Sequence, residues 1–454
     1  MAAQKHPHPW LFALTGMPYG VVGSFSSAVM TYLTREAGVD VGNIGWYFTL
    51  LMVPTFVQFL YAPIVDIGPR RKYWLMIVTA VGAACIFAAC VTPLPEHIEL
   101  FLAFAFAGQM ISGLVGACNG GLLATTMPDH LRGKASGALN IGNLCGGGIS
   151  ASIAVYMTGH HFAPWIIGLV LAAMMILPSF AVLAIVEPKR ERRAPAEVFR
   201  GTLRDVGEVL FSKMGITGIL LFLSPVGTAA LSQYFNAMGV DYVRSEVVEV
   251  VPDPTSVEVA ARMLLTELAE AKTVVTEILT DQAVSERVSD VLVLVTGSLG
   301  IALTAIGAYV GGWLCDRTNR RAMYLLSAVL TAACAIVMGL SPRTETTFFA
   351  GALTYQLITG FCYASFTATV LETIGNAGKA ASTQYTLFVA AGNGAITWVT
   401  LVDTRFHEKH GVEGVVWSDA LLNLAGVVVL VSVFVALGTF GKSRHQPAAQ
   451  PSDG

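Results

Sequence analysis

The sequence predicts an all-α membrane protein in which twelve transmembrane helices form two pseudo-symmetric six-helix bundles. Hydrophobic residues make up 54% of the 454 residues, and charged residues make up only 13%. A soluble domain carries about 25% charged residues, so most of this surface must face lipid. Twelve apolar runs are long enough to cross a bilayer, and patterns in the first six recur in the last six.

Each apolar run is about 20 residues or longer, which is the length that a helix needs to span the hydrocarbon layer. Because this layer offers no water, each run must satisfy its backbone hydrogen bonds internally, which favours helices. The runs cover approximately residues 10–34, 44–66, 73–93, 98–126, 135–158, 163–186, 214–236, 291–315, 322–341, 346–373, 380–402 and 416–440.

Basic residues concentrate on one side of these runs. Nineteen lysines and arginines lie in the termini and in one set of connections. The opposite short connections hold only four, which are Arg35, Arg343, Arg405 and Lys409. Because connections rich in lysine and arginine stay in the cytoplasm, both termini of this multi-pass protein are predicted to be cytoplasmic.

The two halves share patterns at corresponding places. Gly108-Gln109 and Gly113 in the fourth run correspond to Tyr355-Gln356 and Gly360 in the tenth, which indicates a duplicated six-helix unit. The predicted domains are an N-terminal bundle (1–186), a cytoplasmic linker with an amphipathic helix (187–213), a C-terminal bundle (214–440) that contains an extracytoplasmic helical insertion (241–290), and a disordered tail (441–454).

The insertion at 241–290 has no counterpart in the first half. It holds eleven acidic and four basic residues. Thr255 and Glu258 match a helix capping box, and apolar residues follow at helical spacing. The segment is either a binding site for a partner on the outer face or a decoration that packs on its own apolar stripe.

A charged motif follows the second run and returns after the eighth, 250 residues later. Each copy has an aspartate, three residues and two adjacent arginines. A carboxylate there can pair with the arginines or face the positive end of a neighbouring helix. The repetition indicates a shared, state-dependent role rather than two sets of flanking charges. The residues are Asp66, Arg70 and Arg71 in the first copy and Asp316, Arg317, Arg320 and Arg321 in the second.

Ionisable side chains are almost absent from the middle of the runs. Glu372, near the end of the tenth run, is a candidate for carrying a coupling proton, and the alternative is a helix-end carboxylate paired with Lys379. Buried amides and tyrosines suit a neutral or amphipathic solute, although a single amide can also join two helices. The candidate cavity residues are Tyr32, Gln109, Asn119, Asn143, Gln233, Gln356, Tyr363 and Gln384.

Other chemistry has little support. His160-His161 and the pair His407 and His410 lack cysteine or acidic partners at ligand spacing, so no metal site is predicted. Neither a phosphate-binding loop nor a hydrolase motif is present, so neither an enzyme nor an ATP-driven pump is expected. No cofactor or nucleic acid is expected. The expected partners are a small-molecule solute, a proton and the lipid bilayer.

The charged motif resembles the loop signature of the major facilitator superfamily, Gly-x-x-x-Asp-Arg-x-Gly-Arg-Arg. The first copy keeps its aspartate and both final arginines, and the second also keeps Gly312 and Arg317. The resemblance implies that these charges latch the cytoplasmic side in one conformation. It also implies that the fourth and tenth helices line a solute cavity.

Residues 14–75 and Leu131-Arg132-Gly133 are similar to AmpG-type muropeptide permeases, a branch that also contains acetyl-CoA and siderophore carriers. This resemblance implies location in the cell inner membrane of a bacterium. It also implies proton-driven inward transport of a muropeptide, a siderophore or a related amphipathic compound, by rocking of the two bundles. An exporter or facilitator of the same fold is one alternative. A non-transporting receptor that uses the acidic insertion is another.

Overall fold

The computed structural model describes residues 6–30, 33–34, 37–39, 41–160, 162–187, 223–235, 238, 242, 299–374 and 381–436. Within these ranges the chain is helical, with short connections and no strand. The predicted tail and almost all of the predicted linker and insertion lie outside the described residues. The predicted seventh run is described only around residues 223–235, so the count of twelve helices stays a prediction.

The helices of the first half follow the predicted runs closely. They are α1 (Leu11–Ser24), continued by the π-helix η1 (Phe25–Val29), α3 (Val41–Tyr61), continued by the 3₁₀-helix η2 (Ala62–Asp66), α4 (Arg71–Val91), α5 (Ile98–Thr126), the 3₁₀-helix η3 (Asp129–Leu131), α6 (Arg132–Gly159), α7 (Pro164–Ser179) and the 3₁₀-helix η4 (Phe180–Ala184).

The second half contains the 3₁₀-helix η5 (Ala230–Tyr234), α13 (Leu299–Cys315), α14 (Arg320–Leu340), α15 (Glu345–Ile374) and α16 (Ala381–Ala436). Asn319 caps α14, because its side-chain oxygen accepts hydrogen bonds from the Arg321 and Ala322 amides at 3.0 and 3.3 Å. Within the described residues, seven helices are long and apolar enough to cross a membrane, and three shorter apolar helices accompany them.

The helix α16 accounts for two of the predicted runs. Its 56 residues are divided at Gly411, whose φ of 62° and ψ of −152° are not helical. This backbone conformation is accessible almost only to glycine. The first arm therefore ends at His410, and the second arm begins at Val412 and packs back against α14.

We expect Gly411→Val to lower the free energy of unfolding by about 1–3 kcal/mol, because valine must adopt a backbone conformation that is strained for a branched side chain. The melting temperature of the purified protein checks this. Gly23→Ala is the control, because a Cβ atom at Gly23 meets no atom within 4 Å and the α1 backbone there is helical. Equal melting temperatures for the two variants would contradict the assignment of Gly411 as the turn.

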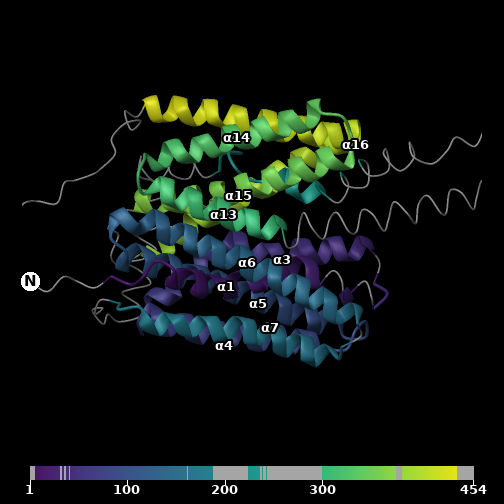
Figure 1. Cartoon of the computed structure of the whole chain (residues 1–454). Helices are drawn as coiled ribbons and strands as arrows, with labels where there is room; N and C mark the ends of the chain where they lie inside the picture. Colours follow the sequence, from purple (N-terminus) through teal and green to yellow (C-terminus); the bar gives the residue numbers. More distant parts are fainter. Residues whose placement is uncertain are drawn as a thin grey trace, which may run out of the picture.

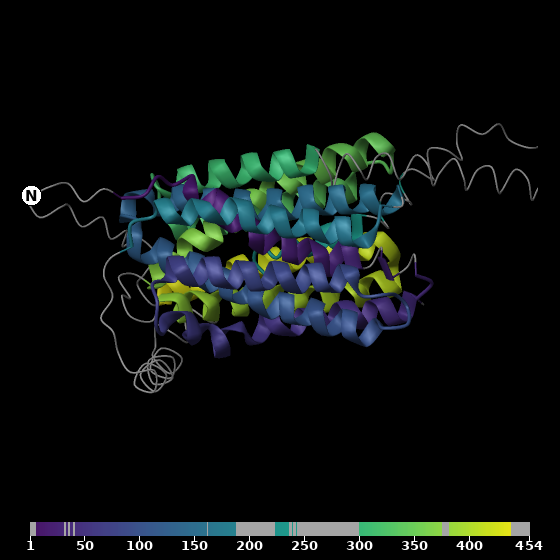
Figure 2. The same ribbon diagram turned by 90° about the horizontal axis from the view of Figure 1, so that it is seen from below.

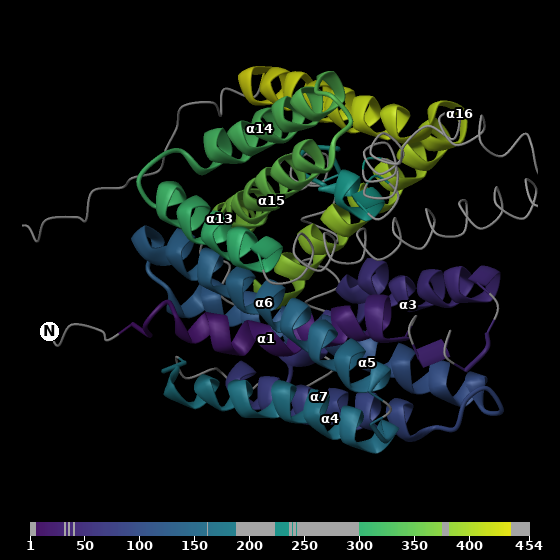
Figure 3. The same cartoon turned by 45° about the vertical axis from the view of Figure 1, so that its right-hand side comes forward.

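The helices run roughly along one common axis, and those of the second half lie together on one side of those of the first (Figures 1 and 2). Within the first half, α4 packs against α5 and α7. The same kind of packing recurs in the second half, where α14 packs against α15 and α16. Between the halves, α6 lies beside α13 (Figure 3), and α16 packs against α3 and α5.

Large apolar side chains cover much of the outside of the bundle. Leu169, Val337 and Val428 are each more than half exposed, at 53%, 62% and 66%. Exposed apolar surface on this scale suits contact with lipid rather than with water. Polar side chains are instead found inside, so the candidate site must be sought between the helices.

Candidate functional site

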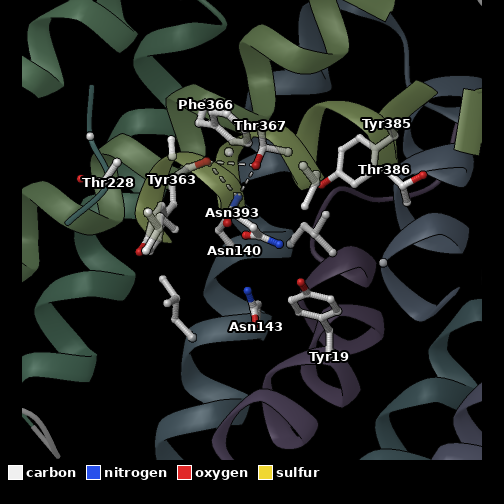
Figure 4. A pocket seen from close by; sticks show the side chains of 18 of the residues that line it. Tyr19, Asn140, Asn143, Thr228, Tyr363, Phe366, Thr367, Tyr385, Thr386 and Asn393 are labelled. Atoms are coloured by element: carbon white, nitrogen blue, oxygen red, sulfur yellow. Dashed lines mark hydrogen bonds between the residues drawn. The ribbon is translucent and has the colours of Figure 1, made fainter. Parts of the chain in front are cut away.

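The interface between the two halves encloses a central cavity of about 330 Å³ (Figure 4). One wall comes from α1, α3, α5 and α6, and the other comes from residues 224–228, α14, α15 and α16. The lining side chains that can form hydrogen bonds are Tyr19, Gln58, Asn119, Asn140, Asn143, Ser224, Thr228, Tyr324, Tyr363, Thr367, Tyr385, Thr386 and Asn393.

The cavity lining is polar but uncharged. It contains no aspartate, glutamate, lysine, arginine or histidine among the described residues. Asn140 holds the two halves together at one edge, since its Nδ2 donates to Thr367 Oγ1 at 3.0 Å and to Tyr363 O at 3.3 Å (Figure 4). Tyr19 of α1 and Asn393 of α16 line the cavity from the two halves (Figure 4).

Two lining groups have unused hydrogen-bonding capacity. Asn119 donates to Thr15 O at 2.8 Å, but its Oδ1 is buried without a partner among the described residues. The Thr228 hydroxyl, on the opposite wall, is also buried without a partner in this part of the chain. Buried polar atoms normally find partners, so these two are available to a bound solute.

The predicted cavity residues divide into distinct groups. Asn119, Asn143 and Tyr363 line the cavity. Gln109 and Gln356 do not; they accept hydrogen bonds from Ser26 at 3.0 Å and from Thr304 at 3.2 Å, respectively, and so join neighbouring helices. The half-buried Gln384 also lies outside the lining. Tyr32 and the side chain of Gln233 lie outside the described residues.

Several lining residues are not among the cavity residues predicted from the sequence. Asn140 lies one helical turn before Asn143, and Tyr385 lies two turns before Asn393 in an otherwise apolar stretch. Polar residues that recur on one face of an apolar helix are a signal for a cavity, and this signal was available in the sequence. The only other amide in α3 is Asn43 near its start, so Gln58 gave no such pattern.

The first copy of the charged motif lies within one half. Arg71 donates to Asp66 Oδ1 from Nε at 3.0 Å and from Nη2 at 2.8 Å, and both residues are buried. The Glu187 carboxylate accepts from the Arg71 and Lys72 backbone amides at 3.1 and 3.2 Å. It therefore binds the positive N-terminal end of α4, where a negative charge is favourable. The half-buried Arg70 immediately precedes α4.

The second copy connects the two halves. Asp316, after α13, accepts hydrogen bonds from the Gly133 and Lys134 backbone amides at 2.6 and 2.8 Å. It thereby caps the N-terminus of α6, whose own preceding residue supplies no side-chain cap. Arg320 donates to Asp129 Oδ1 at 3.1 Å, which adds an ion pair across the same boundary.

The remaining residues of the second copy contact their own half. Arg317 lies over the Trp313 ring at 3.8 Å. Arg321 pairs with Glu372 at 3.7 Å and also lies over Phe434. The Glu372 side chain is 29% exposed, so the structure places this candidate proton carrier in an ion pair at the edge of the protein and not in the cavity lining.

Burial raises the pKa of Asp316 above its usual range, and the hydrogen bonds from Lys134 and Gly133 and the charge of Arg320 act in the opposite direction. Since the raised value persists, these contacts do not fully compensate for the removal of the carboxylate from water.

The backbones of α6 and α13 approach closely beside this contact. A Cβ atom at Gly137 would lie only 2.6 Å from Ala308 O, and one at Gly312 would overlap the carbonyl of Gly133. Ser136 Oγ reinforces the boundary by donating to Ala364 O of α15 at 2.8 Å. Glycine therefore permits the two halves to meet here at backbone distance.

We expect Gly137→Ala to separate α6 from α13 and to reduce the population of the closed contact by about 5- to 150-fold, since overpacking typically costs about 1–3 kcal/mol. Limited proteolysis near Gly133, compared between the variant and the wild type, would report the opening. Faster cleavage in Gly137→Ala than in Gly23→Ala is the expected result. Identical cleavage would show that the boundary tolerates a methyl group.

The amino-acid sequence matches the family described as Major Facilitator Superfamily over residues 12–270, which is more than half of the chain. The chain belongs to the major facilitator superfamily. Residues 255–405 also match the family described as Sugar (and other) transporter. No curated protein matches the sequence.

Solved structures of major facilitator superfamily proteins share the fold. The E. coli fucose:proton symporter FucP superposes with a TM-score of 0.62 at 14% identity, over 93% of this chain and 97% of that chain. The human organic anion transporter MFSD10 superposes with a TM-score of 0.59 at 16% identity, over 92% of this chain and 98% of that chain. The proton:xylose symporter XylE superposes with a TM-score of 0.55 at 11% identity, over 93% of this chain and 94% of that chain. This superfamily member is therefore a multi-pass membrane transporter and not an enzyme.

Proposed function

We propose that this transporter imports a small uncharged organic solute across a bacterial inner membrane in exchange for the free energy of a proton gradient. The central cavity carries the proposal. It combines hydroxyl and amide groups from both halves with tyrosine rings, and it has no charged group among the described lining residues. Such a site binds through hydrogen bonds and ring faces, and a charged solute would find no counter-ion.

The size of the cavity favours a compact solute. Its volume of about 330 Å³ lies at the lower end of the range of ligand pockets, about 300–1,000 Å³. Muropeptides and siderophores, which the sequence suggests, would require the cavity to expand. Fucose and xylose, after which the symporters FucP and XylE are named, are smaller and rich in hydroxyl groups. We therefore favour a solute of this polar, uncharged kind.

The contact between Asp316 and the N-terminus of α6 acts as the latch of the transport cycle. It joins the halves at the end that carries most of the basic residues, which we assign to the cytoplasm together with both chain termini. Closing this latch while the other side opens gives alternating access to the cavity. The latch consists of two hydrogen bonds to Asp316 and one ion pair across the boundary, so solute binding is able to shift its equilibrium. Arg320 adds its ion pair with Asp129 to the latch. Asp66, Arg70 and Arg71 fix the geometry of the first half, and Arg317 and Arg321 do the same in the second.

A thermal-shift screen followed by uptake into proteoliposomes tests the proposed function. The panel contains L-fucose, D-xylose, peptidoglycan fragments, siderophores and acyl-CoA compounds. We expect a compact uncharged compound to raise the melting temperature and to accumulate inside vesicles when the outside is acidic. A protonophore should abolish this accumulation. Accumulation that persists without a pH gradient would refute proton coupling, and a shift caused only by charged compounds would refute the substrate class.

A further inference from the structure

Two aspartates are buried together in the second half, outside the cavity lining. Asp403 and Asp419 lie on the two arms of α16, and neither residue has any exposed surface. They are close enough to repel each other electrostatically. Within the described residues, no salt bridge joins either carboxylate to a cation.

Each carboxylate has one bonded oxygen and one free oxygen. Ser418 Oγ donates to Asp403 Oδ1. The Tyr355 hydroxyl donates to Asp419 Oδ2 at 3.2 Å, and the Leu231 backbone amide lies close to the Asp419 carboxylate. Asp403 Oδ2 and Asp419 Oδ1 are buried without a hydrogen-bond partner in the described part of the chain. Each of these two oxygens could accept a hydrogen bond from a protonated carboxyl.

Two buried carboxylates without a cation are unfavourable when both are ionised. One proton held between Asp403 Oδ2 and Asp419 Oδ1 would lower the charge of the pair from −2 to −1 and give both free oxygens a partner. A Ca²⁺ or Mg²⁺ ion needs about 6 or more oxygen ligands. No group of three or more metal-binding side chains occurs among the described residues. The pair therefore suits a proton better than a divalent cation.

Among the described residues, three titratable groups on neighbouring elements face the pair, and all three are neutral near physiological pH. They are Tyr355 of α15, Cys334 of α14 and Tyr234 of η5. Because none of these three carries a charge there, the protonation of the aspartate pair decides the charge among them. His407, one turn after Asp403 on the same arm, stacks on the Tyr234 ring. Two carboxylates that interact in this way titrate as one unit.

The pair is connected to the cavity wall through a broken segment of backbone. Asn423 lies one turn after Asp419. Its Nδ2 donates to the Asp419 backbone carbonyl at 2.9 Å, and its Oδ1 accepts a hydrogen bond from the Gly227 backbone amide at 2.9 Å. Gly227 lines the cavity, and the chain then reaches Leu231 through Ala229. Gly227 and Ala229 have φ values of 68° and 55°, so this segment is not a regular helix and stores strain at the alanine.

We propose that Asp403 and Asp419 form a two-carboxylate site that holds a single proton and carries it through the transport cycle. The proposal rests on the proposed function for its role in transport. Loss of the proton leaves two carboxylates that repel each other, and the resulting movement reaches the cavity through residues 227–231. Glu372, in its ion pair with Arg321, then serves the structure and not the coupling.

Infrared spectroscopy of the purified protein tests for the bound proton without any solute. A protonated carboxyl has a carbonyl stretch that is distinct from the carboxylate bands. We expect the wild type to keep this band at neutral pH and the double variant Asp403→Asn with Asp419→Asn to lose it. Each single variant should bind the proton about 10-fold more weakly or worse, because the charge repulsion is gone. Glu372→Gln should keep the band, and so should Glu99→Gln, a matched change at an exposed carboxylate.

Persistence of the band in the double variant, or its absence from the wild type at neutral pH, would overturn the proposal. Removal of the band by sodium ions at constant pH would overturn it in favour of a cation site. Since asparagine has the shape of a protonated aspartate, folding should be retained, and the melting temperature checks this. The infrared measurement needs no solute. Failure of the proposed substrate class in the solute screen is therefore distinguished from failure of the proton site.

Transport assays then test the role of the proton. With the compound that gives the largest thermal shift in the screen, the single variants should keep exchange between equal pH values. They should lose accumulation driven by a pH gradient by about 10-fold or more, the effect of a typical coupling free energy. Full accumulation in the double variant would place the coupling group elsewhere.

Discussion

Replacement of Asp316 with asparagine is expected to lower the transport rate by about 10- to 100-fold while the protein stays folded. The Asp316 carboxylate accepts two backbone hydrogen bonds from the first turn of α6, and its charge faces the positive end of that helix. Asparagine has one acceptor oxygen and no charge. It forfeits about 1.5–3 kcal/mol of contact that exists only while the halves are latched.

The first copy of the motif supplies a matched comparison. Asp66→Asn removes the charge that pairs with the buried Arg71 within one half. Breaking a buried ion pair costs about 3–5 kcal/mol, so this variant should lower the melting temperature more than Asp316→Asn does. The transport rate per folded molecule should fall less in Asp66→Asn than in Asp316→Asn. Measurements of uptake and melting temperature on both variants decide the matter, and unchanged uptake in Asp316→Asn would count against the latch.

Replacement of Thr228 with valine is expected to weaken solute binding by about 3- to 10-fold and to leave the empty protein as stable as before, or slightly more stable. The Thr228 hydroxyl is buried in the cavity wall and has no partner among the described residues. Removal of an unsatisfied hydroxyl relieves a desolvation cost in the empty protein. In the complex, the same change removes a hydrogen bond to the solute.

Thr304→Val is the matched control for this prediction, because it makes the same chemical change at another buried threonine. Thr304 Oγ1 donates to Gly300 O at 2.7 Å and to Gln356 at 3.2 Å, outside the cavity lining. We expect Thr304→Val to lower the melting temperature and to leave solute affinity unchanged. Calorimetric binding with the screened compound provides the measurement. The reverse pattern of effects would exclude Thr228 from the binding site.

The fold class could be predicted because its signals are local. The helices α4, α5, α14 and α15 begin and end within a few residues of the apolar runs predicted for them. A run of this length in hydrocarbon must form a helix whatever surrounds it. The helix boundary at Gly411 was harder to predict from the sequence, because glycine residues also occur at many helix contacts in this chain.

The site could be predicted only in part. The sequence identified buried amides, but it could not distinguish Asn143, which faces the cavity, from Gln109, which bonds to Ser26. It also offered Glu372 as a candidate for carrying a coupling proton. It did not bring Asp403 and Asp419 together, because the sequence does not define the geometry of the turn between them. The rotation of each helix about its axis decides such questions, and packing against neighbours sets that rotation.

By itself, the sequence determined that this chain crosses the membrane many times, on which side its basic residues gather, and that the Asp66 and Asp316 motifs are copies. Hydrophobicity, charge and repetition are properties of the chain alone, so they can be read directly from it. Only the tertiary structure decided that Asp316 bridges the halves whereas Asp66 stays within one, and that an uncharged cavity lies between them. These features arise where surfaces from distant parts of the chain meet, and no local pattern encodes how closely two helices approach.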